Sequence, residues 1–190
     1  MRNASICVYC GSRFGADPAF EAQADALGRA IAGEGWRLVY GAGDVGLMGV
    51  VARGAIAAGG ETLGAIPQHL LDLEVGKLDL TAMVVTETMH ERKKVMVMNA
   101  DAIVVMPGGA GTLDEFFEVL TWRQLGLHAK PIVLMDVNGF WAPLTGLIDH
   151  VIGQGFADRS LADFVQIGGS AEAAVTLLRA ALADTMPAAE

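Results

Sequence analysis

Short, continuously apolar runs alternate with helical patterns along almost the whole 190-residue chain. Runs such as AIVVMP and PIVLM have no polar face, which is typical of parallel strands covered by helices on both sides. The pattern predicts strands at about 5–10, 36–41, 61–66, 81–87, 101–106, 131–136 and 163–167. It predicts helices at about 18–34, 46–59, 89–99, 112–126, 140–153 and 170–183. Such alternation indicates an α/β fold, a three-layer, doubly wound parallel sheet that is Rossmann-like, with helices on both faces.

The length of the chain fits one domain of this kind. Its 190 residues are too few for a TIM barrel, which typically needs about 250. Hydrophobic residues make up 53% and charged residues 18%, whereas disordered chains show the opposite balance. We therefore expect a single domain over residues 1–184 and a frayed C-terminal tail at 185–190.

Charge and hydropathy restrict the partners of the chain. The formal net charge is −9 and there is no dense Lys/Arg stripe, so nucleic acid is not an expected partner. A small anion remains compatible, because salt screens surface fields within ~8 Å. No apolar run reaches the ~18–20 residues of a membrane span, and the N-terminus lacks the apolar core of a signal peptide. We expect a cytoplasmic protein with no membrane partner.

The two cysteines, Cys7 and Cys10, have the C-x-x-C spacing of some redox and zinc sites. They lie inside SICVYC, an expected strand, and not at a helix start where thiolates are stabilised. No second pair is present to complete a zinc site. Two small buried hydrophobic residues are therefore the favoured interpretation, and no metal is expected.

The first glycine-rich turn, GAGDVGLMG, follows the expected strand WRLVYG and opens a helix. Gly41, Gly43 and Gly46 satisfy G-x-G-x-x-G in the strand-to-helix context of a phosphate-binding turn. A dinucleotide site also needs an acidic residue at the carboxyl end of the next strand, whereas Glu61 lies at its start. The turn therefore predicts a phosphate site without NAD, against the alternative of a tight turn that binds nothing.

The second glycine-rich turn, PGGAGTLDE, follows the buried strand AIVVM. Gly108, Gly109 and Gly111 form a turn rich in exposed N–H groups, and a helix is expected to start at about Thr112. Both turns follow parallel strands, so we expect them to hold one anion at the carboxyl edge of the sheet. Two interpretations of Glu115 stay open. T-x-x-E is a capping box, in which Glu115 only caps the helix, or else the carboxylate faces a different part of the ligand.

Arg92, Lys93 and Lys94 form the densest positive charge of the chain. They lie early in the helix expected at 89–99, where the helix dipole disfavours cations, so a functional role is indicated. Arg92 offers a planar fork that fits phosphate or carboxylate oxygens. The alternative is a solvated helix face. His90 has no second histidine at ligand spacing, so a helix-entry hydrogen bond is favoured over metal binding.

Three stretches together resemble a known family: YGAGDVGLMG (40–49), MHERK (89–93) and PGGAGTLDE (107–115). They are similar to the lonely guy family of cytokinin riboside 5′-monophosphate phosphoribohydrolases, many of which carry the label lysine decarboxylase. The resemblance runs from VYCGS to TWRQLGLHAKP. It implies a Rossmann-like nucleotide-binding domain that hydrolyses an adenosine-type 5′-monophosphate to free base and ribose 5-phosphate. It also implies a homodimer that uses no organic cofactor and no metal.

The resemblance assigns catalytic roles to Arg92 and Glu115. Substrate contacts are expected in the glycine turns and at the positions that the resemblance adds: Gly43, Gly46, Glu74, Lys93, Gly108, Gly109, Ala110, Gly111, Thr112, Leu113, Asp114 and Thr121. Glu74 falls in the irregular tract 69–80, which we expect to be a loop with a short helical turn overhanging the site. Two positions depart from the family pattern, because many relatives have glycine at Ala42 and serine at Arg13.

Other functions stay open. A nucleotide or cofactor carrier would have the same glycine turns but would not need Glu115 with Arg92. A pyridoxal-phosphate decarboxylase would need a Schiff-base lysine, and none stands out. The preferred base, adenine or N6-prenylated adenine, is not determined. Candidates for the pocket wall that would decide it are Met89, Met96, Trp122 and Leu125, although such spacing is more typical of core packing.

Overall fold

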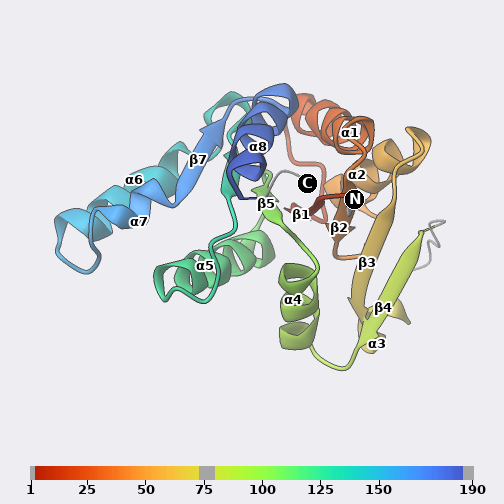
Figure 1. The fold of residues 1–190 in the computed structure, drawn as a ribbon, viewed down its shortest axis with the longest axis horizontal. Helices are drawn as coiled ribbons and strands as arrows, with labels where there is room; N and C mark the ends of the chain where they lie inside the picture. The colour runs from red at the N-terminus through yellow and green to blue at the C-terminus, as the bar shows by residue number, and fades with distance from the viewer. Residues whose placement is uncertain (1–2, 73–79, 186–190) are drawn as a thin grey trace.

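The computed structural model describes residues 3–72 and 80–185, which form one seven-stranded, all-parallel sheet in the order β4-β3-β2-β1-β5-β6-β7 (Figure 1). The strands are β1 (Ser5–Tyr9), β2 (Arg37–Tyr40), β3 (Thr62–Pro67), β4 (Ala82–Thr86), β5 (Ala102–Val105), β6 (Ile132–Met135) and β7 (Val165–Gly168). The doubly wound parallel sheet expected from the sequence is therefore confirmed.

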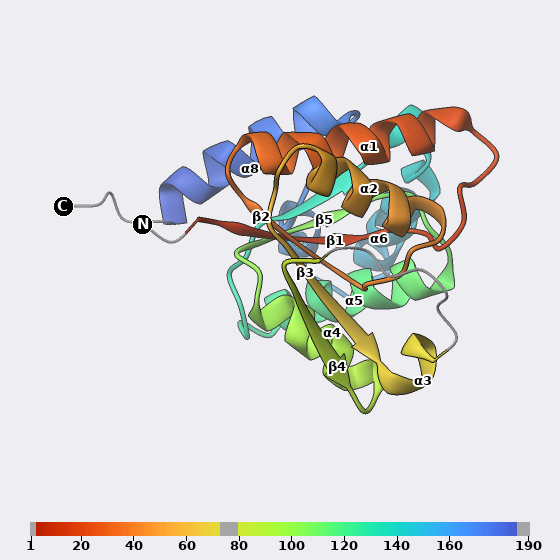
Figure 2. The same cartoon turned by 90° about the vertical axis from the view of Figure 1, so that its right-hand side faces the viewer.

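Helices cover both faces of this sheet. They are α1 (Pro18–Gly33), α2 (Gly46–Ala57), α3 (Gln68–Leu71), α4 (Met89–Met98), α5 (Ala110–Gln124), α6 (Ala142–Gly153), α7 (Ser160–Asp163) and α8 (Ala171–Thr185), with a 3₁₀ turn at Val137–Gly139. Figure 2 shows α1, α2 and α8 on one side of the sheet and α4 and α5 on the other.

Alternate strand residues therefore enter two separate cores. In β1, Ile6 and Val8 pack under α1 and α2, whereas Cys7 and Tyr9 pack against α4 and α5. Both sets are buried, which explains why the central strands show no polar face in the sequence. None of the helices in the described ranges is both long and apolar enough to cross a membrane.

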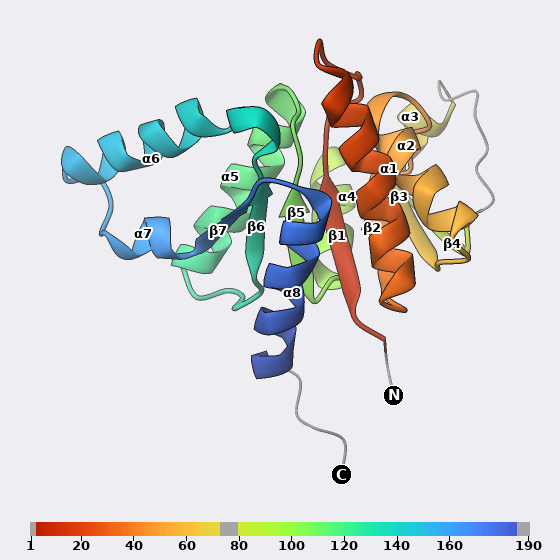
Figure 3. The ribbon, with the colours of Figure 1, turned by 90° about the horizontal axis from the view of Figure 1, so that it is seen from above.

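The sheet reverses its winding direction at β1. Strands β2, β3 and β4 extend to one side of β1, and β5, β6 and β7 extend to the other, as the view from above shows (Figure 3). Strands β1 and β5 are direct parallel neighbours, with Cys7 opposite Ile103. Ligands of open α/β sheets bind at such a switch point, beyond the carboxyl ends of the strands, and both glycine-rich turns lie there.

The expected strands and long helices are confirmed, and α3 lies where a short helical turn was expected at the start of the tract 69–80, while α7 and the 3₁₀ turn were not predicted. The expected start of the helix at Thr112 is wrong, and the difference decides how Glu115 is interpreted. Helix α5 begins at Ala110 with Gly109 as its N-cap, two residues before the expected start at Thr112. Thr112 is therefore inside the helix, and the capping box that was one of the two open interpretations of Thr112 and Glu115 is not formed.

A capping box of the same T-x-x-E pattern exists at the start of α4 instead. The Glu91 N–H donates to Thr88 Oγ1 at 3.2 Å, and the Thr88 N–H donates to Glu91 Oε2 at 3.2 Å. This cap offsets part of the unfavourable position of the cations that follow it in α4. The tail expected at 185–190 begins inside α8, which continues to Thr185, and residues 186–190 lie outside the described part.

Ala42, directly after β2, has a φ of 56°, in the left-handed region that favours glycine. We expect Ala42→Gly to raise the free energy of unfolding by about 0.5–1 kcal/mol, because relief of the left-handed strain exceeds the added entropy of the unfolded chain. Urea denaturation would measure the change. Ala58→Gly is the matched control, because Ala58 is exposed and has an ordinary φ of −90°, so glycine should give no gain there. An equal effect of both substitutions would contradict the strain argument.

Candidate functional site

A cleft of about 700 Å³ opens at the carboxyl edge of the sheet, across the β1–β5 switch point. The loops after β1, β2 and β5 form its floor. Glu115 and Arg92 both line it, although they come from different helices, α5 and α4. The sequence-predicted residues that the cleft brings together are Gly43, Arg92, Gly108, Gly109, Ala110, Gly111, Thr112, Asp114 and Glu115.

The second glycine turn presents a helix N-terminus to this cleft. No side chain caps α5 at Gly109, and the hydrogen bonds of the helix begin with the Leu113 amide, which donates to the Gly109 carbonyl at 3.0 Å. A Cβ added at Gly109 or Gly111 would meet no atom within 4 Å, so the backbone lies open. The free amides and the positive end of the helix dipole form a site suited to a phosphate group.

Gly108 has a different role in the same turn. A Cβ there would lie 2.1 Å from Thr112 Oγ1 and 2.9 Å from the Gly11 amide nitrogen. The Gly11 amide donates to the Pro107 carbonyl at 3.0 Å, so the loops after β1 and β5 are packed directly on each other. The glycine here permits close packing of the loops rather than access for a ligand.

The first glycine turn is largely explained by contacts within the protein. A Cβ at Gly41 would lie 1.7 Å from Nη2 of Arg92, and that Nη2 donates to the Gly41 carbonyl at 3.1 Å. Gly46 has a φ of 59° and packs on Ser12, and it does not line the cleft. The Leu47 amide, near the start of α2, already donates to the Gly11 carbonyl. The G-x-G-x-x-G spacing thus positions Arg92 and the β1 loop, and Gly41 and Gly43 are its members that line the cleft.

Arg92 is buried, with 7% of its surface exposed, so the alternative of a solvated helix face is wrong for this residue. Besides the Gly41 carbonyl, its guanidinium contacts two thioethers, with Nη1 3.7 Å from Met89 Sδ and Nη2 4.0 Å from Met48 Sδ. Its buried Nε has no hydrogen-bond partner in the described part of the chain. Thioether sulfur is a weak acceptor, so Arg92 keeps hydrogen-bonding capacity for an anionic or hydroxyl-bearing ligand in the cleft.

Glu115 lies in the second turn of α5 and is 9% exposed. Burial raises the pKa of its carboxyl from 4.5 to about 7, with Arg92 opposing the rise and Asp114 adding to it. A carboxyl group that changes its charge near neutral pH and faces a cleft is a candidate acid, base or electrostatic stabiliser. The helix-cap interpretation of this residue is excluded by its position in α5.

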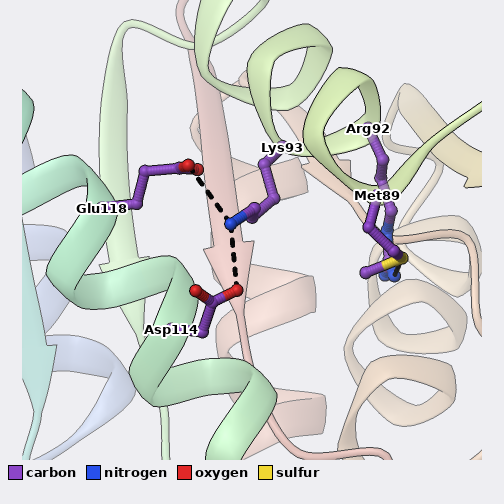
Figure 4. A network of polar contacts seen from close by, with 5 residues as sticks. All are labelled: Met89, Arg92, Lys93, Asp114 and Glu118. Atoms are coloured by element: carbon purple, nitrogen blue, oxygen red, sulfur yellow. Dashed lines mark hydrogen bonds and ion pairs between the residues drawn. The ribbon is translucent and has the colours of Figure 1, made fainter.

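Three further expected contact residues, Lys93, Leu113 and Thr121, lie outside the cleft. Lys93 is 4% exposed and pairs with Asp114 and Glu118 between α4 and α5 (Figure 4). Leu113 packs against the core on the α4 and α5 side of the sheet, and Thr121 is exposed on α5. Neither they nor Lys93 line the cleft. Glu74 lies outside the described residues.

The apolar wall of the cleft differs from the one expected. Of the four candidates only Met89 lines the cleft, whereas Met96 is buried in the core, Trp122 packs against it and Leu125 is exposed. The apolar side chains that do line it are Phe14, Phe20, Val45, Leu47, Met48, Ile66, Leu70, Met89 and Phe140. They come from five separate parts of the chain, so periodicity within one helix could not reveal them.

The cysteines are free and buried, and burial raises the pKa of both thiols. Cys10 borders the cleft, but a thiol that stays protonated is a poor nucleophile or metal ligand. Within residues 3–72 and 80–185 no group of three His, Cys, Asp or Glu side chains is arranged to hold a metal ion.

The sequence of the chain is similar to one protein family and to individual proteins from a plant and a bacterium. The family model described as "Possible lysine decarboxylase" matches residues 48–178. A "probable cytokinin riboside 5′-monophosphate phosphoribohydrolase" of Oryza sativa subsp. japonica is 41% identical over 174 residues, which are 92% of this chain and 77% of that protein. The cytokinin riboside 5′-monophosphate phosphoribohydrolase of Rhodococcoides fascians is 40% identical over 176 residues, 92% of this chain and 89% of that one.

Solved structures of related fold extend the comparison. The molybdenum cofactor binding protein of Rippkaea orientalis is 27% identical, with a TM-score of 0.73, over 96% of this chain and 99% of that one. The molybdenum cofactor carrier protein of Chlamydomonas reinhardtii is 22% identical, with a TM-score of 0.74 over the same shares, and shows likeness of fold alone.

Proposed function

Because the chain belongs to the lonely guy family of cytokinin riboside 5′-monophosphate phosphoribohydrolases, we propose that it hydrolyses the N-glycosidic bond of adenosine 5′-monophosphates. The products are the free base, adenine or an N6-substituted adenine, and ribose 5-phosphate. The observation that carries the proposal is that the buried carboxyl of Glu115 and the guanidinium of Arg92 line the same cleft as the uncapped N-terminus of α5.

The chemistry of the bond explains this arrangement. When the base departs, positive charge develops on the ribose ring, and an adjacent carboxylate stabilises it and can orient the attacking water. The water oxygen bonds to the anomeric carbon, the carbon–nitrogen bond breaks, and the base leaves with a proton that comes from the water. We assign the carboxylate to Glu115, the 5′-phosphate to the amides of Gly109–Thr112, and orientation of the ribose or phosphate to Arg92.

The walls of the cleft suit a base with an apolar substituent. Aromatic side chains from the β1 loop, α1 and the segment after β6 line the cleft, and Phe20 and Phe140 make an edge-to-face contact with centroids 5.5 Å apart. Flat purine rings and prenyl tails both bury apolar surface favourably against such walls. We therefore include N6-prenylated AMP among the proposed substrates.

The direct test is a panel of AMP, N6-prenylated AMP and the corresponding nucleosides, with free base followed by chromatography. We expect base release from the monophosphates and at least about a hundredfold less from the nucleosides, because the α5 amides would have no phosphate to bind. Tight binding of AMP without base release would favour the carrier function instead, which the molybdenum cofactor binding relative represents. No base release and no binding would overturn both.

A pyridoxal-phosphate decarboxylase is not supported. Of the described lysines, Lys93 is paired with two carboxylates, Lys130 donates to the Ala100 carbonyl and Lys94 is exposed. None of these three lines the cleft, where a Schiff-base lysine would have to stand.

The rate should depend on pH through Glu115. Since burial raises the pKa of this carboxyl to about 7, the ionised form that we propose to be active dominates only above that pH. We expect kcat to rise about tenfold per pH unit below pH 7 and to level off above it. The measurement uses saturating AMP, because the phosphate itself titrates near pH 6 and would affect kcat/KM. A kcat that is already constant from pH 5 upward would contradict an ionising Glu115.

We also propose that two copies associate through the exposed face of α5. Phe117 on that helix and Leu125, its C-cap residue, are exposed apolar residues, and Thr121 lies between them in the sequence and is also exposed. Exposed apolar surface of this kind is typical of interfaces. Light scattering of the intact protein should give twice the mass of the 19.9 kDa chain, and Leu125→Asp should give one. A wild-type mass of one chain would contradict the proposal.

A further inference from the structure

Lys93 is the most deeply buried lysine among the described residues, and its ammonium group is engaged by the protein itself. Its side chain is 5% exposed, and Nζ lies 2.9 Å from Asp114 Oδ2 and 3.2 Å from Glu118 Oε1 (Figure 4). These ion pairs join α4 to α5 in the described part of the chain. A lysine in this position has little capacity left for a substrate, although the family resemblance suggests a substrate contact.

The ion pairs lie next to the two proposed catalytic residues in the sequence. Arg92 precedes Lys93 in α4, and Glu115 follows Asp114 in α5, so each functional residue is next in sequence to a member of the ion-pair network. Glu118 is one helical turn beyond Asp114, so the network grips α5 at two points. Any sliding of α5 along α4 would break the ion pairs and would move Glu115 relative to Arg92.

We propose that Lys93 and Glu118 are positioning residues for the hydrolysis: their ion pair, in which the lysine is buried and the carboxylate half-buried, braces α5 against α4 and holds Glu115 beside Arg92 in the cleft. This proposal rests on the proposed function. It reassigns Lys93 from substrate contact to positioning residue. It also gives a role to Glu118, whose Oε1 pairs with Lys93 and whose buried Oε2 has no hydrogen-bond partner within the described ranges.

The residues of the ion pairs also act on Glu115 through their charges. The ammonium group of Lys93 lowers the pKa of Glu115, whereas the carboxylates of Asp114 and Glu118 raise it. Loss of Lys93 alone would leave two carboxylates uncompensated near Glu115, and loss of Glu118 alone would leave excess positive charge. The charged and titratable groups that act on Glu115 are Arg92 and Lys93 from α4, Asp114 and Glu118 from α5, and Cys7, Tyr9 and Cys10 from β1 and the residue after it.

The test compares Lys93→Met, Glu118→Gln and the double variant with the wild type. We expect Lys93→Met to lower kcat for AMP at least about tenfold, because small displacements of catalytic groups have large effects on rate. KM should change less than threefold, and the pH at which kcat levels off should move upward. Glu118→Gln should lower kcat and move that pH downward. The double variant should lose less than the product of the two single losses, because both substitutions remove the same ion pair.

The following outcomes would overturn the positioning role of Lys93 and Glu118. A large rise in KM for AMP on Lys93→Met, with kcat and its pH profile unchanged, would make Lys93 a substrate ligand. Additive losses, or a Glu118→Gln variant that equals the wild type, would also contradict it. If Lys93→Met does not fold, Lys93→Arg and Glu118→Gln still test the charge and the pair, since Arg preserves the ion pair and should leave the pH profile in place.

A second measurement separates failure of the brace from failure of the proposed function. The difference in unfolding temperature between the wild type and Glu115→Gln, followed from pH 5 to 9, reports the ionisation of Glu115 without any turnover. The pH at which this difference develops should rise in the Lys93→Met background and fall in the Glu118→Gln background. If this pH is the same in all backgrounds, Lys93 and Glu118 are not positioning residues, even if the enzyme is active. If this pH shifts as expected but no base is released, the positioning role of Lys93 and Glu118 is supported and only the proposed hydrolysis is wrong.

Discussion

Replacing Glu115 with glutamine should lower the rate of base release from AMP by about a thousandfold, while the affinity for AMP stays within a few fold of the wild type. Glutamine keeps the shape of the side chain but cannot carry the negative charge that offsets the developing charge on the ribose. The phosphate would still meet the amides at the start of α5, which the substitution does not touch. Single-turnover kinetics and isothermal titration with AMP measure the two quantities separately.

The same variant should be more stable than the wild type at pH 8. The pKa of Glu115 is raised from 4.5 to about 7 on folding, so the stability gained from the protonated form is complete below pH 4.5 and is lost as the pH rises through 7. The loss is about 3 kcal/mol at most, and glutamine does not suffer it. The gain on substitution should therefore shrink between pH 8 and pH 5.

A matched control is Glu61→Gln. Glu61 is exposed and precedes β3 at the opposite edge of the sheet from the cleft, so neither rate nor stability should change measurably. A Glu115→Gln variant that loses stability and keeps its activity would mean that the carboxylate serves the fold and not the reaction. A variant that loses both stability and affinity would place the damage in the α5 turn as a whole.

Gly41→Ala should lower kcat/KM for AMP by about a hundredfold, although glycine to alanine is one of the smallest possible changes. The new Cβ would lie 1.7 Å from Nη2 and 2.8 Å from Cζ of Arg92, so the guanidinium has to leave its place. Misplacement of an orienting group by about 1 Å is enough for a loss of this size. The Arg92→Met variant should show a similar loss, and the double variant should be little worse than either, because both remove the same interaction.

The control for this prediction is Gly146→Ala in α6, where an added Cβ would meet no atom within 4 Å. It should keep full activity and gain slightly in stability, because alanine is the better helix former. Unfolding temperatures of all variants are needed, since Gly41→Ala could also loosen the loop after β2. If Gly41→Ala keeps the wild-type rate while remaining folded, then the position of Arg92 over Gly41 is not required for the reaction.

Several features of the fold and the site could be predicted from local sequence. Uninterrupted apolar strands alternating with helices allow few arrangements other than a parallel sheet covered on both faces, and that sheet is confirmed. A glycine turn between such a strand and a helix must lie at the carboxyl edge of the sheet. The turn before α5 was therefore identified, together with its open backbone at Gly109 and Gly111.

Two motifs have roles that the sequence alone could not reveal: T-x-x-E at Thr112–Glu115 and the glycine motif at 41–46. The pattern at Thr112–Glu115 left a cap open as one of two interpretations, but α5 begins earlier, with Gly109 as its N-cap. The same pattern at Thr88–Glu91 does form a capping box. Gly41 resembled a phosphate-binding glycine, and its contacts show that it makes room for Arg92, 51 positions away in the chain. Identical local motifs thus acquired different roles from residues distant in sequence.

The sequence by itself determined the layered α/β architecture, the edge of the sheet at which the cleft opens and the family of the chain, because these follow from periodicity and short motifs. Only the tertiary structure decided which cations are buried, which lysine is paired and which carboxyl group titrates near neutral pH. The physical reason is that desolvation, steric exclusion and ion pairing depend on neighbours from other elements. Arg92 meets Gly41, Lys93 meets Asp114 and Glu118, and Glu115 loses water only after α4, α5 and β1 have packed together.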